Sequence, residues 1–330
     1  MEAENSEVAA LVEKMAVLHA AISKLPSLSP SPAVDKLFTE LVAACVPPSP
    51  VDVTRLGPGP RRVREELIRL CSDAEGRLEA HYADALAAFD NPLDHLHRFP
   101  YYGNYVNLSR LEYELLARYA APAGGMAAAR VAFVGSGPLP FSSLVLAASH
   151  MPEAVFDNYD LDGAANERAR RLVRADADVG ARMSFRTADV ADLGDELGAY
   201  DVVFLAALVG VAAEEKAKII AHLGRHMADG AALVVRSAHG ARGFLYPIVD
   251  PSDVARGGFD VLAVCHPEDE VINSVIVARK AAPEAARGTA PGGGLPVVSP
   301  PCRCCDMAAG GALPAKRMDM AVHATEEVSF

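Results

Sequence analysis

The chain has 330 residues, of which 51% are hydrophobic, and it carries a formal net charge of −12 at pH 7. This length and apolar content suffice for one large or two modest hydrophobic cores. The acidic charge argues against nucleic acid or an anionic membrane surface as the main partner.

The beginning of the chain and its cysteines indicate a cellular compartment. Residues 1–7 are acidic and lack the basic and apolar regions of a signal peptide. The longest apolar run, residues 202–213, is too short to cross a bilayer, so we interpret it as a core strand that continues into a loop. The six cysteines lack the even spacing of a disulfide framework. We therefore expect a cytoplasmic protein with no transmembrane segment.

Residues 1–120 are predicted to form an N-terminal α-helical domain. Apolar residues recur at helical spacing over 8–22, 34–46 and 63–89, and proline-containing breaks separate these stretches at 26–32 and 47–60. A further helix is expected over 108–119. The segment 121–129 is rich in glycine, alanine and proline, which indicates a domain junction.

From Arg130 the pattern changes to alternating strands and helices. Strands are expected near 131–134, 155–159, 184–187, 201–206 and 231–236, with a closing pair near 261–265 and 272–279. These repeats predict an α/β fold, a Rossmann-like sheet over 121–280 of the kind found in S-adenosylmethionine-dependent methyltransferases, with an antiparallel edge strand at its end. The composition of 281–330 is typical of a disordered C-terminal tail.

The segment 130–140 reads as a buried strand, a glycine turn and the start of a helix. Gly135 and Gly137 let the backbone bend sharply and approach a ligand closely. Asp160, which ends the next strand about 20 positions beyond the loop, suits the hydroxyls of a ribose. The third glycine of a dinucleotide fingerprint is replaced by Pro140, so no pyrophosphate is required. This pattern favours S-adenosylmethionine over NAD.

The carboxyl ends of the predicted strands should converge on one nucleoside site. Asp189 ends the third strand, where its carboxylate could accept a hydrogen bond from an adenine amino group. Alternatively, Asp160, Asp162 and Asp189 cap helices or lie in solvated loops, and for Asp162 capping is the favoured interpretation. The predicted nucleoside-binding residues are Gly135, Ser136, Gly137, Pro138, Asp160, Thr187, Ala188, Asp189, Leu205 and Ala206.

Tyrosines 101, 102 and 105 precede the last helix of the N-terminal region, with Gly103 and Asn104 between them. Pro100 and Gly103 predict a turn here rather than a regular helix. Tyrosine hydroxyls and the asparagine amide on such a turn could hold an amino-acid head group. They could equally pack between the domains, since tyrosine fills interfaces well. The residues alone leave both interpretations open.

Three long segments, 95–108, 131–140 and 234–247, closely resemble plant nicotianamine synthases, and the resemblance extends from residue 8 to residue 280. It implies a helical N-terminal domain on a methyltransferase-like Rossmann domain. It also implies a transferase that condenses three S-adenosylmethionine molecules by aminocarboxypropyl transfer and azetidine ring closure. The products would be nicotianamine and three methylthioadenosines. Nicotianamine chelates iron, zinc and copper, which implies a role in metal homeostasis and phytosiderophore synthesis.

In the implied reaction, an amine nitrogen attacks the carbon beside the sulfonium. An ammonium has no lone pair, and an α-amino group is mostly protonated at pH 7. A nearby carboxylate can orient the amine and take its proton. The resemblance favours Glu79 as this base, with Tyr105 orienting it or relaying its proton, and Glu75 as a second carboxylate on the same helical face. Without the resemblance, a solvated face paired with Arg77 or Arg64 is the better interpretation.

The remaining predictions concern substrate and metal. Arg236 and Tyr246 could bind substrate carboxylates, although Arg236 could instead pair with a structural acid. The predicted substrate-binding residues are Glu75, Tyr101, Asn104, Arg236 and Tyr246. No metal site is expected, because the cysteines of 302–305 and the scattered histidines lack the spacing of a four-ligand set. The sheet pattern alone leaves two other functions open, an ordinary methyltransferase and a non-catalytic S-adenosylmethionine sensor. The oligomeric state is a separate open question, with a homo-oligomer as one alternative.

Overall fold

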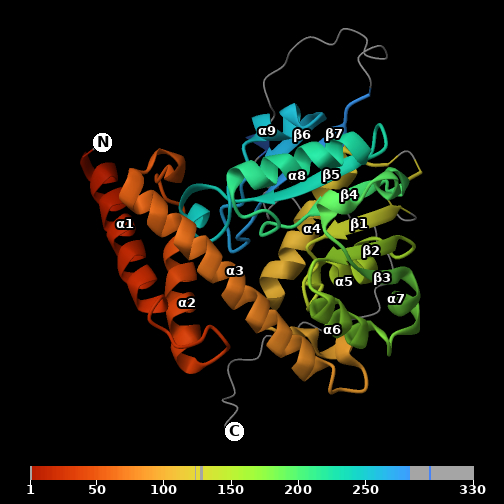
Figure 1. The fold of residues 1–330 in the computed structure, drawn as a ribbon, viewed down its shortest axis with the longest axis horizontal. Coiled ribbons are helices and arrows are strands. Elements are labelled where there is room, and N and C mark those ends of the chain that lie inside the picture. Colours follow the sequence, from red (N-terminus) through yellow and green to blue (C-terminus); the bar gives the residue numbers. More distant parts are fainter. Residues whose placement is uncertain (1, 123, 127–128, 283–296, 299–330) are drawn as a thin grey trace, which may run out of the picture. The chain divides into compact units, whose positions relative to one another are not determined.

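The computed structural model describes residues 2–122, 124–126, 129–282 and 297–298 (Figure 1). Its α-helices are α1 Glu2–Ile22, α2 Pro32–Cys45, α3 Pro58–Leu86, α4 Tyr102–Tyr119, α5 Phe141–Val145, α6 Gly163–Val173, α7 Ala177–Arg182, α8 Ala213–His226 and α9 Pro251–Arg256. Its strands are β1 Arg130–Val134, β2 Val155–Asp160, β3 Met183–Thr187, β4 Val202–Leu205, β5 Ala232–Ser237, β6 Phe259–Cys265, β7 Ser274–Lys280 and β8 Val297–Val298. The predicted tail 281–330 lies outside the described residues, except for 281–282 and 297–298.

The strands form one sheet with the order β3-β2-β1-β4-β5-β7-β6-β8. The predicted α/β sheet is confirmed: β3, β2, β1, β4 and β5 are parallel, whereas β7 pairs antiparallel with both β5 and β6. The antiparallel strand lies inside the sheet, so the expectation that it forms an edge is wrong. Its apolar run Val275 to Ala278 is buried on both faces, which places it between two strands.

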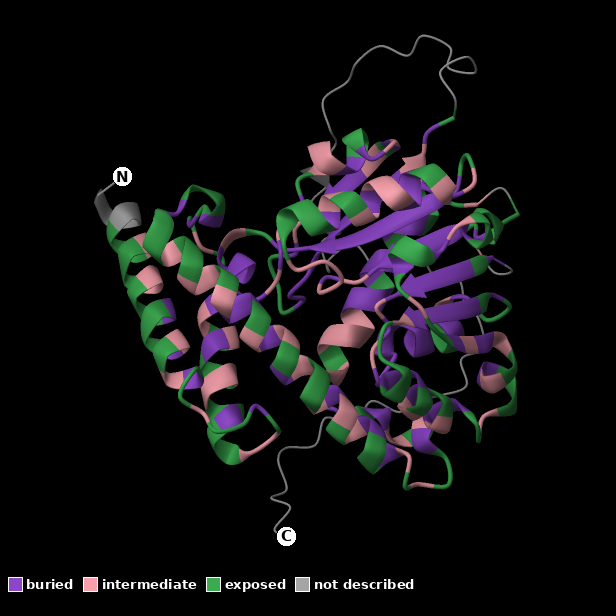
Figure 2. Cartoon of the chain, viewed as in Figure 1, coloured by how far each residue is buried: buried purple, intermediate pink, exposed green. Residues whose placement is uncertain are grey.

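Alternation along the strands divides the core between the two faces of the sheet. Val131 and Phe133 contribute to one buried cluster, and Ala132 and Val134 to the other. Figure 2 shows the strands as a buried layer, with exposed residues on the outer faces of the helices. Strand order reverses between β1 and β4, and ligands of doubly wound sheets bind beside such a reversal, at the carboxyl ends of the strands.

The first three helices share a third buried cluster with the segments that follow β5 and precede β7, including Phe244 and Ile272. Met15 of α1, Leu41 of α2 and Leu67 of α3 belong to this cluster. Helix α3 begins at Pro58, inside the stretch predicted as a break, because prolines in a first helical turn remove N–H groups that have no intrahelical partner anyway. The proposed division between domains at residue 120 stays a prediction.

The predicted turn is confirmed at Pro100 and Tyr101 but is wrong at Gly103, because helix α4 begins at Tyr102. Pro100 precedes the helix and therefore does not interrupt its hydrogen bonds. Gly103 lies in the first turn, where it costs about 1 kcal/mol relative to alanine. Burial of Leu108 and Leu115 on the same helix outweighs that cost, because each buried leucine contributes about 1.5–3 kcal/mol.

A buried ion pair joins α4 to the sheet. Arg236 of β5 donates to both carboxylate oxygens of Glu112, over 2.7 and 2.9 Å, and to the Ser142 hydroxyl of α5 over 2.6 Å. Glu112 is fully buried and Arg236 is 7% exposed. The pair thereby links α4, α5 and β5 at one point.

The Glu112→Gln substitution should lower the free energy of unfolding by about 3–5 kcal/mol, because it leaves the Arg236 charge buried without an anionic partner. Urea denaturation measures this loss. The matched control is Glu114→Gln, at an exposed position of the same helix, which should change stability by less than about 0.5 kcal/mol. Equal stability of the two variants would show that the ion pair is not a major link.

Candidate active site

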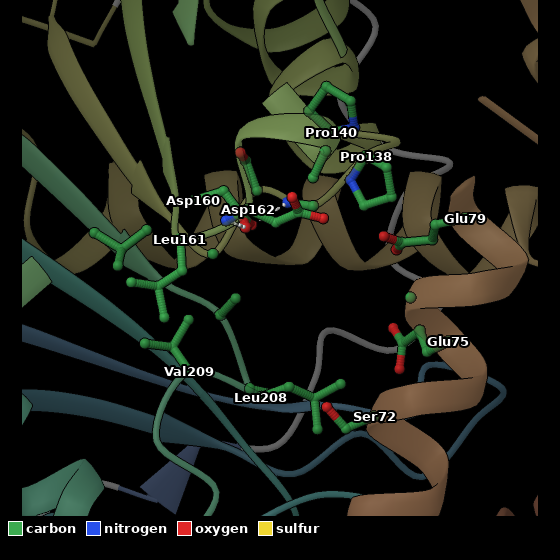
Figure 3. Close-up of a pocket in the computed structure, with 18 of the residues that line it drawn as sticks. Ser72, Glu75, Glu79, Pro138, Pro140, Asp160, Leu161, Asp162, Leu208 and Val209 are labelled. Atoms are coloured by element: carbon green, nitrogen blue, oxygen red, sulfur yellow. Dashed lines mark hydrogen bonds between the residues drawn. The ribbon is translucent and has the colours of Figure 1, made fainter. Parts of the chain in front are cut away.

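A cavity of about 730 Å³ lies between α3 and the carboxyl ends of β1, β2 and β4. Its volume falls in the range of small-molecule sites. Figure 3 shows Glu75 and Glu79 projecting from α3 toward the loop that carries Pro138 and toward Asp160. The cavity therefore places two carboxylates opposite the glycine loop.

The glycine loop after β1 is held close to α3. Gly135 and Gly137 have φ angles of +81° and +69°, which side-chain-bearing residues rarely adopt. A Cβ at Gly137 would lie 2.5 Å from the Glu79 Oε2 atom, and a Cβ at Gly135 would lie 2.2 Å from the Val209 side chain. Glycine is thus required here both for the backbone conformation and for the close approach of Glu79.

The side chain of Asp160 binds the backbone of this loop. Its Oδ2 accepts from the Gly137 N–H over 2.9 Å, and its Oδ1 accepts from the Asp162 N–H over 2.9 Å. Each carboxylate oxygen has a second lone pair, so both remain able to accept from hydroxyl groups. Asp162 caps α6 by accepting from the Ala164 N–H, which confirms the capping interpretation.

Eight of the ten predicted nucleoside-binding residues line the cavity. Asp189 does so while also capping a short 3-10 helix through the Ala191 N–H. Thr187 and Leu205 are not lining residues: the Thr187 hydroxyl accepts from the Asn166 amide, and Leu205 is fully buried in the core. The lining residues are Gly135, Ser136, Gly137, Pro138, Asp160, Ala188, Asp189 and Ala206.

The two carboxylates on α3 share one tyrosine. The Tyr105 hydroxyl lies 2.9 Å from Glu75 Oε1 and 3.1 Å from Glu79 Oε1, and the Tyr246 hydroxyl donates to Glu75 Oε2 over 2.9 Å. The interpretation of a solvated face paired with Arg77 or Arg64 is wrong. Arg77 pairs with Asp73, and Arg64 donates to the Gly243 carbonyl.

Burial has the largest effect on the pKa values of Glu75 and Glu79. It raises the pKa of Glu79 well above its ordinary value, and the negative charge of Glu75 raises it further. Burial also raises the pKa of Glu75, but hydrogen bonds from Tyr105 and Tyr246 oppose that effect. Glu79 is therefore the carboxyl that holds a proton more readily, as befits a group that must accept one from a substrate.

The predicted substrate-binding residues divide between two cavities. Glu75, Arg236 and Tyr246 line the large cavity, although Arg236 also forms the structural pair with Glu112 that was the alternative prediction. Tyr101 and Asn104 instead line a neighbouring cavity of about 290 Å³. The Asn104 side-chain oxygen accepts from the Ile272 N–H.

Sequence reasoning missed Lys216 of α8. Its ammonium, buried at the carboxyl end of β4, donates to the Ala206 and Ala207 carbonyls over 2.9 and 3.0 Å and so supports a cavity-lining loop. Burial lowers the pKa of Lys216 to about 7. Its spacing from Ile220 and Leu223 places it on the apolar face of the helix, and that pattern could have identified it. The apolar wall of Leu161, Leu208 and Val209 was also missed.

Among the described residues, no group of three or more His, Cys, Asp or Glu side chains is arranged to hold a metal ion, and the segment 302–305 lies outside them. Within the same residues, no helix combines the length and the apolar character needed to cross a bilayer.

Comparison with known sequences gives the family. A family model described as nicotianamine synthase protein matches residues 3–285. The chain belongs to the nicotianamine synthase family. Nicotianamine synthase 2 of Oryza sativa subsp. japonica is 77% identical over 315 residues, which cover 94% of this chain and 96% of that protein. Probable nicotianamine synthase 2 of Hordeum vulgare is 69% identical over 335 residues, covering 99% and 98% of the two chains.

Solved structures show that the family fold extends to distant sequences. The crystal structure of MtNAS in complex with MTA and tNA has a TM-score of 0.67 to this chain at 20% identity, and covers 82% of this chain and 98% of its own. A mutant of MtNAS in complex with S-adenosylmethionine gives the same TM-score and coverage at 19% identity. A similar fold thus occurs in a chain where four residues in five differ.

Glu79→Gln should make the protein more resistant to unfolding above pH 4.5, the ordinary pKa of glutamate. Because burial raises the pKa of folded Glu79, its protonated form stabilises the fold at low pH, and that contribution is lost as pH rises through the raised pKa. Each tenfold difference in proton affinity between the folded and unfolded states corresponds to about 1.4 kcal/mol. Glutamine does not titrate and escapes this loss.

Melting temperatures of both proteins between pH 4 and pH 9 measure the effect. The advantage of the variant should grow with pH, whereas Glu65→Gln, at an exposed position of the same helix, should show no such trend. A difference that stays constant over this range would contradict the assigned burial of the Glu79 charge.

Proposed function

We propose that this protein is a nicotianamine synthase, a transferase that condenses three S-adenosylmethionine molecules into nicotianamine and releases three methylthioadenosines. Family membership, with 69–77% identity to relatives of that name, supports this function. The observation that carries the proposal is the contact geometry of Glu79. Its carboxylate lies against Gly137, in the loop that would hold the nucleoside of the donor.

The geometry suits a displacement at the carbon beside the sulfonium. The glycine loop and Asp160 hold the adenosyl end of the donor, while the cavity extends from there to α3. The amine nitrogen of a second molecule attacks the γ-methylene, the carbon–sulfur bond breaks, and its electron pair stays on the sulfur of methylthioadenosine. Glu79 takes the proton of the attacking amine. Since the donor carries its own leaving group, the protein contributes mainly orientation and that base.

Carboxylate recognition is assigned to two side chains of the large cavity. Arg236 lines this cavity while its charge is paired with Glu112, and Tyr246 supplies a hydroxyl near Glu75. The final ring closure uses the same chemistry within one molecule. An amine attacks the γ-carbon of its own aminocarboxypropyl unit, which still carries the sulfonium, and the carbon–sulfur bond breaks to release methylthioadenosine. We assign Tyr105 to orienting Glu79 during these steps.

The wider role follows from the product. Nicotianamine carries amines and carboxylates, which are ligands for iron, zinc and copper, so we propose a role in metal homeostasis and in phytosiderophore synthesis. The free, buried thiols of Cys45, Cys71 and Cys265 support a reducing, cytoplasmic location. Self-association as a homo-oligomer is compatible with this function and is tested by light scattering.

Incubation of the pure protein with S-adenosylmethionine alone tests the proposed function. We expect methylthioadenosine and nicotianamine by mass spectrometry, and Glu79→Gln should retain donor binding while turnover falls by about 10²–10⁴-fold. Production of S-adenosylhomocysteine only when an acceptor is added would indicate a methyltransferase instead. Binding without any turnover would indicate a sensor.

Asp160→Ala should weaken S-adenosylmethionine binding by about 10-fold or more. The substitution removes a charged acceptor for ribose hydroxyls and the anchor of the Gly137 N–H, each of which contributes on the order of 1–3 kcal/mol. Isothermal titration calorimetry measures the affinity. As a control, Asp176→Ala removes only the N-cap of α7, outside the cavity, and should leave affinity within about threefold. Unchanged affinity of Asp160→Ala would remove Asp160 from the donor site.

A further inference from the structure

The two cavities of the protein share a wall. Glu75, Tyr105 and Tyr246 line both the 730 Å³ cavity and the 290 Å³ cavity. The smaller cavity lies between α2, α3 and the start of α4, and it also borders Asp35 and Thr39, two exposed residues of α2. It therefore extends from the hydrogen-bonded carboxylates to the protein surface.

The number of protons shared by Glu75, Glu79 and Tyr105 restricts the protonation state of this wall. The Tyr105 hydroxyl has one proton but lies within hydrogen-bonding distance of both Glu75 and Glu79. Both contacts are favourable only when one carboxyl group is protonated and donates to the Tyr105 oxygen. Glu75 also accepts from Tyr246, which favours its ionised form. The resting arrangement is a chain in which protonated Glu79 donates to Tyr105 and Tyr105 donates to the Glu75 carboxylate.

The proposed reaction produces protons at this wall. Each S-adenosylmethionine carries one net positive charge, whereas methylthioadenosine and nicotianamine carry none, so three protons leave for every nicotianamine formed. In each transfer a nitrogen–carbon bond forms, the carbon–sulfur bond breaks with its electron pair going to sulfur, and one ammonium proton passes to Glu79. A carboxylate that already holds a proton cannot accept another. Glu79 must therefore lose its proton before every transfer.

We propose that Glu79, Tyr105 and Glu75 form a proton relay that empties the base through the smaller cavity, on the side opposite the substrates. The inference rests on the proposed function. A shift of the Tyr105 hydroxyl proton passes the proton of Glu79 to Glu75, and water in the smaller cavity carries it toward Asp35. The relay keeps the proton path separate from the cavity that the donor and the growing product occupy.

The lining of the smaller cavity fits this assignment. Apolar side chains such as Leu28, Val34 and Phe38 form much of it, which disfavours an intermediate that bears several carboxylates. A proton needs only a few ordered waters with polar partners, and Asn104 and Thr39 lie along the lining as such partners. The charged or titratable groups that interact with Glu75 are Tyr101, Tyr105, Tyr246, Arg236, Glu79 and Cys71.

Rapid-quench measurement of methylthioadenosine with Glu75→Gln tests the relay. The glutamine keeps the shape of the side chain but cannot accept the proton. We expect a burst of about one methylthioadenosine per active site, followed by a steady rate lower than wild type by roughly 10²-fold, the usual contribution of a proton-transfer group. The wild-type protein should show a steady rate close to the rate of the first transfer.

The pH profile separates this role from a structural one. Removing the negative charge of Glu75 should lower the pKa of Glu79, so the acid limb of the first transfer should move to lower pH. Added acetate, a small base that can enter from the surface, should restore part of the steady rate. A Glu75→Gln steady rate within twofold of wild type, or a lower rate with neither a burst nor a pH shift, would overturn the relay.

Two further variants keep the test independent of one substitution. Tyr105→Phe retains both carboxyl groups but breaks the relay. Glu79 then keeps the proton of the resting state, so the first transfer itself should be slow and should show no burst. Asp35→Asn should slow the steady rate by a few fold, whereas Glu40→Gln, at an exposed position of α2 that lines neither cavity, should not. Wild-type protein that forms no methylthioadenosine would refute the proposed function. Wild-type turnover with no burst in Glu75→Gln, or a first transfer in Tyr105→Phe as fast as in the wild type, would refute the relay alone.

Discussion

The buried pair of Arg236 and Glu112 is the interaction on which the site depends. It fixes α4 against β5 at a point where Glu112 is fully buried and Arg236 is nearly so, at the wall of the large cavity. Tyr105 lies two helical turns before Glu112 on the same helix, so its position follows from that contact. Tyr105 in turn holds Glu75 and Glu79 of α3. A single chain of contacts therefore transmits the geometry of the sheet to the carboxylates of a helix that precedes it by many residues.

The arrangement that suits the proposed chemistry also lowers the stability of the fold. Placing two carboxylates beside one tyrosine in a buried wall raises the proton affinity of Glu79 and disfavours the ionised pair. A fold selected only for stability would replace these residues with neutral ones. The cost is tolerated because a base near an ammonium substrate needs a raised pKa, and because the hydroxyls of Tyr105 and Tyr246 satisfy the oxygens of Glu75.

Glycine makes the donor loop and the carboxylates parts of one site. At Gly137 a side chain would collide with Glu79, and at Gly135 one would collide with Val209. The N-terminal helices can therefore approach the carboxyl ends of the strands closely enough to close one side of the cavity. The likeness in fold to MtNAS at 20% identity indicates that this arrangement of helices and sheet withstands extensive sequence change.

Much of the architecture could be predicted from local patterns. The strand positions near 131–134 and 155–159, the glycine loop, Asp160 at the end of β2 and the helical cap of Asp162 follow from hydrophobic runs and turn chemistry, which act over a few residues. The place of β7 inside the sheet and the helical start at Tyr102 could not be predicted this way. Both depend on burial against elements distant in the sequence.

The same distinction applies to the candidate site, where some features could be predicted from the sequence and others could not. The sequence by itself determined a nucleoside loop and, through its resemblance to a family, the identity of Glu79, Tyr105 and Glu75. Only the tertiary structure decided that Tyr105 bridges both carboxylates, that Arg236 is committed to Glu112, and that Tyr101 and Asn104 face a separate cavity. The physical reason is that proton affinity and hydrogen-bond partners depend on burial and on distances between side chains of separate elements. No local pattern in the chain encodes those distances.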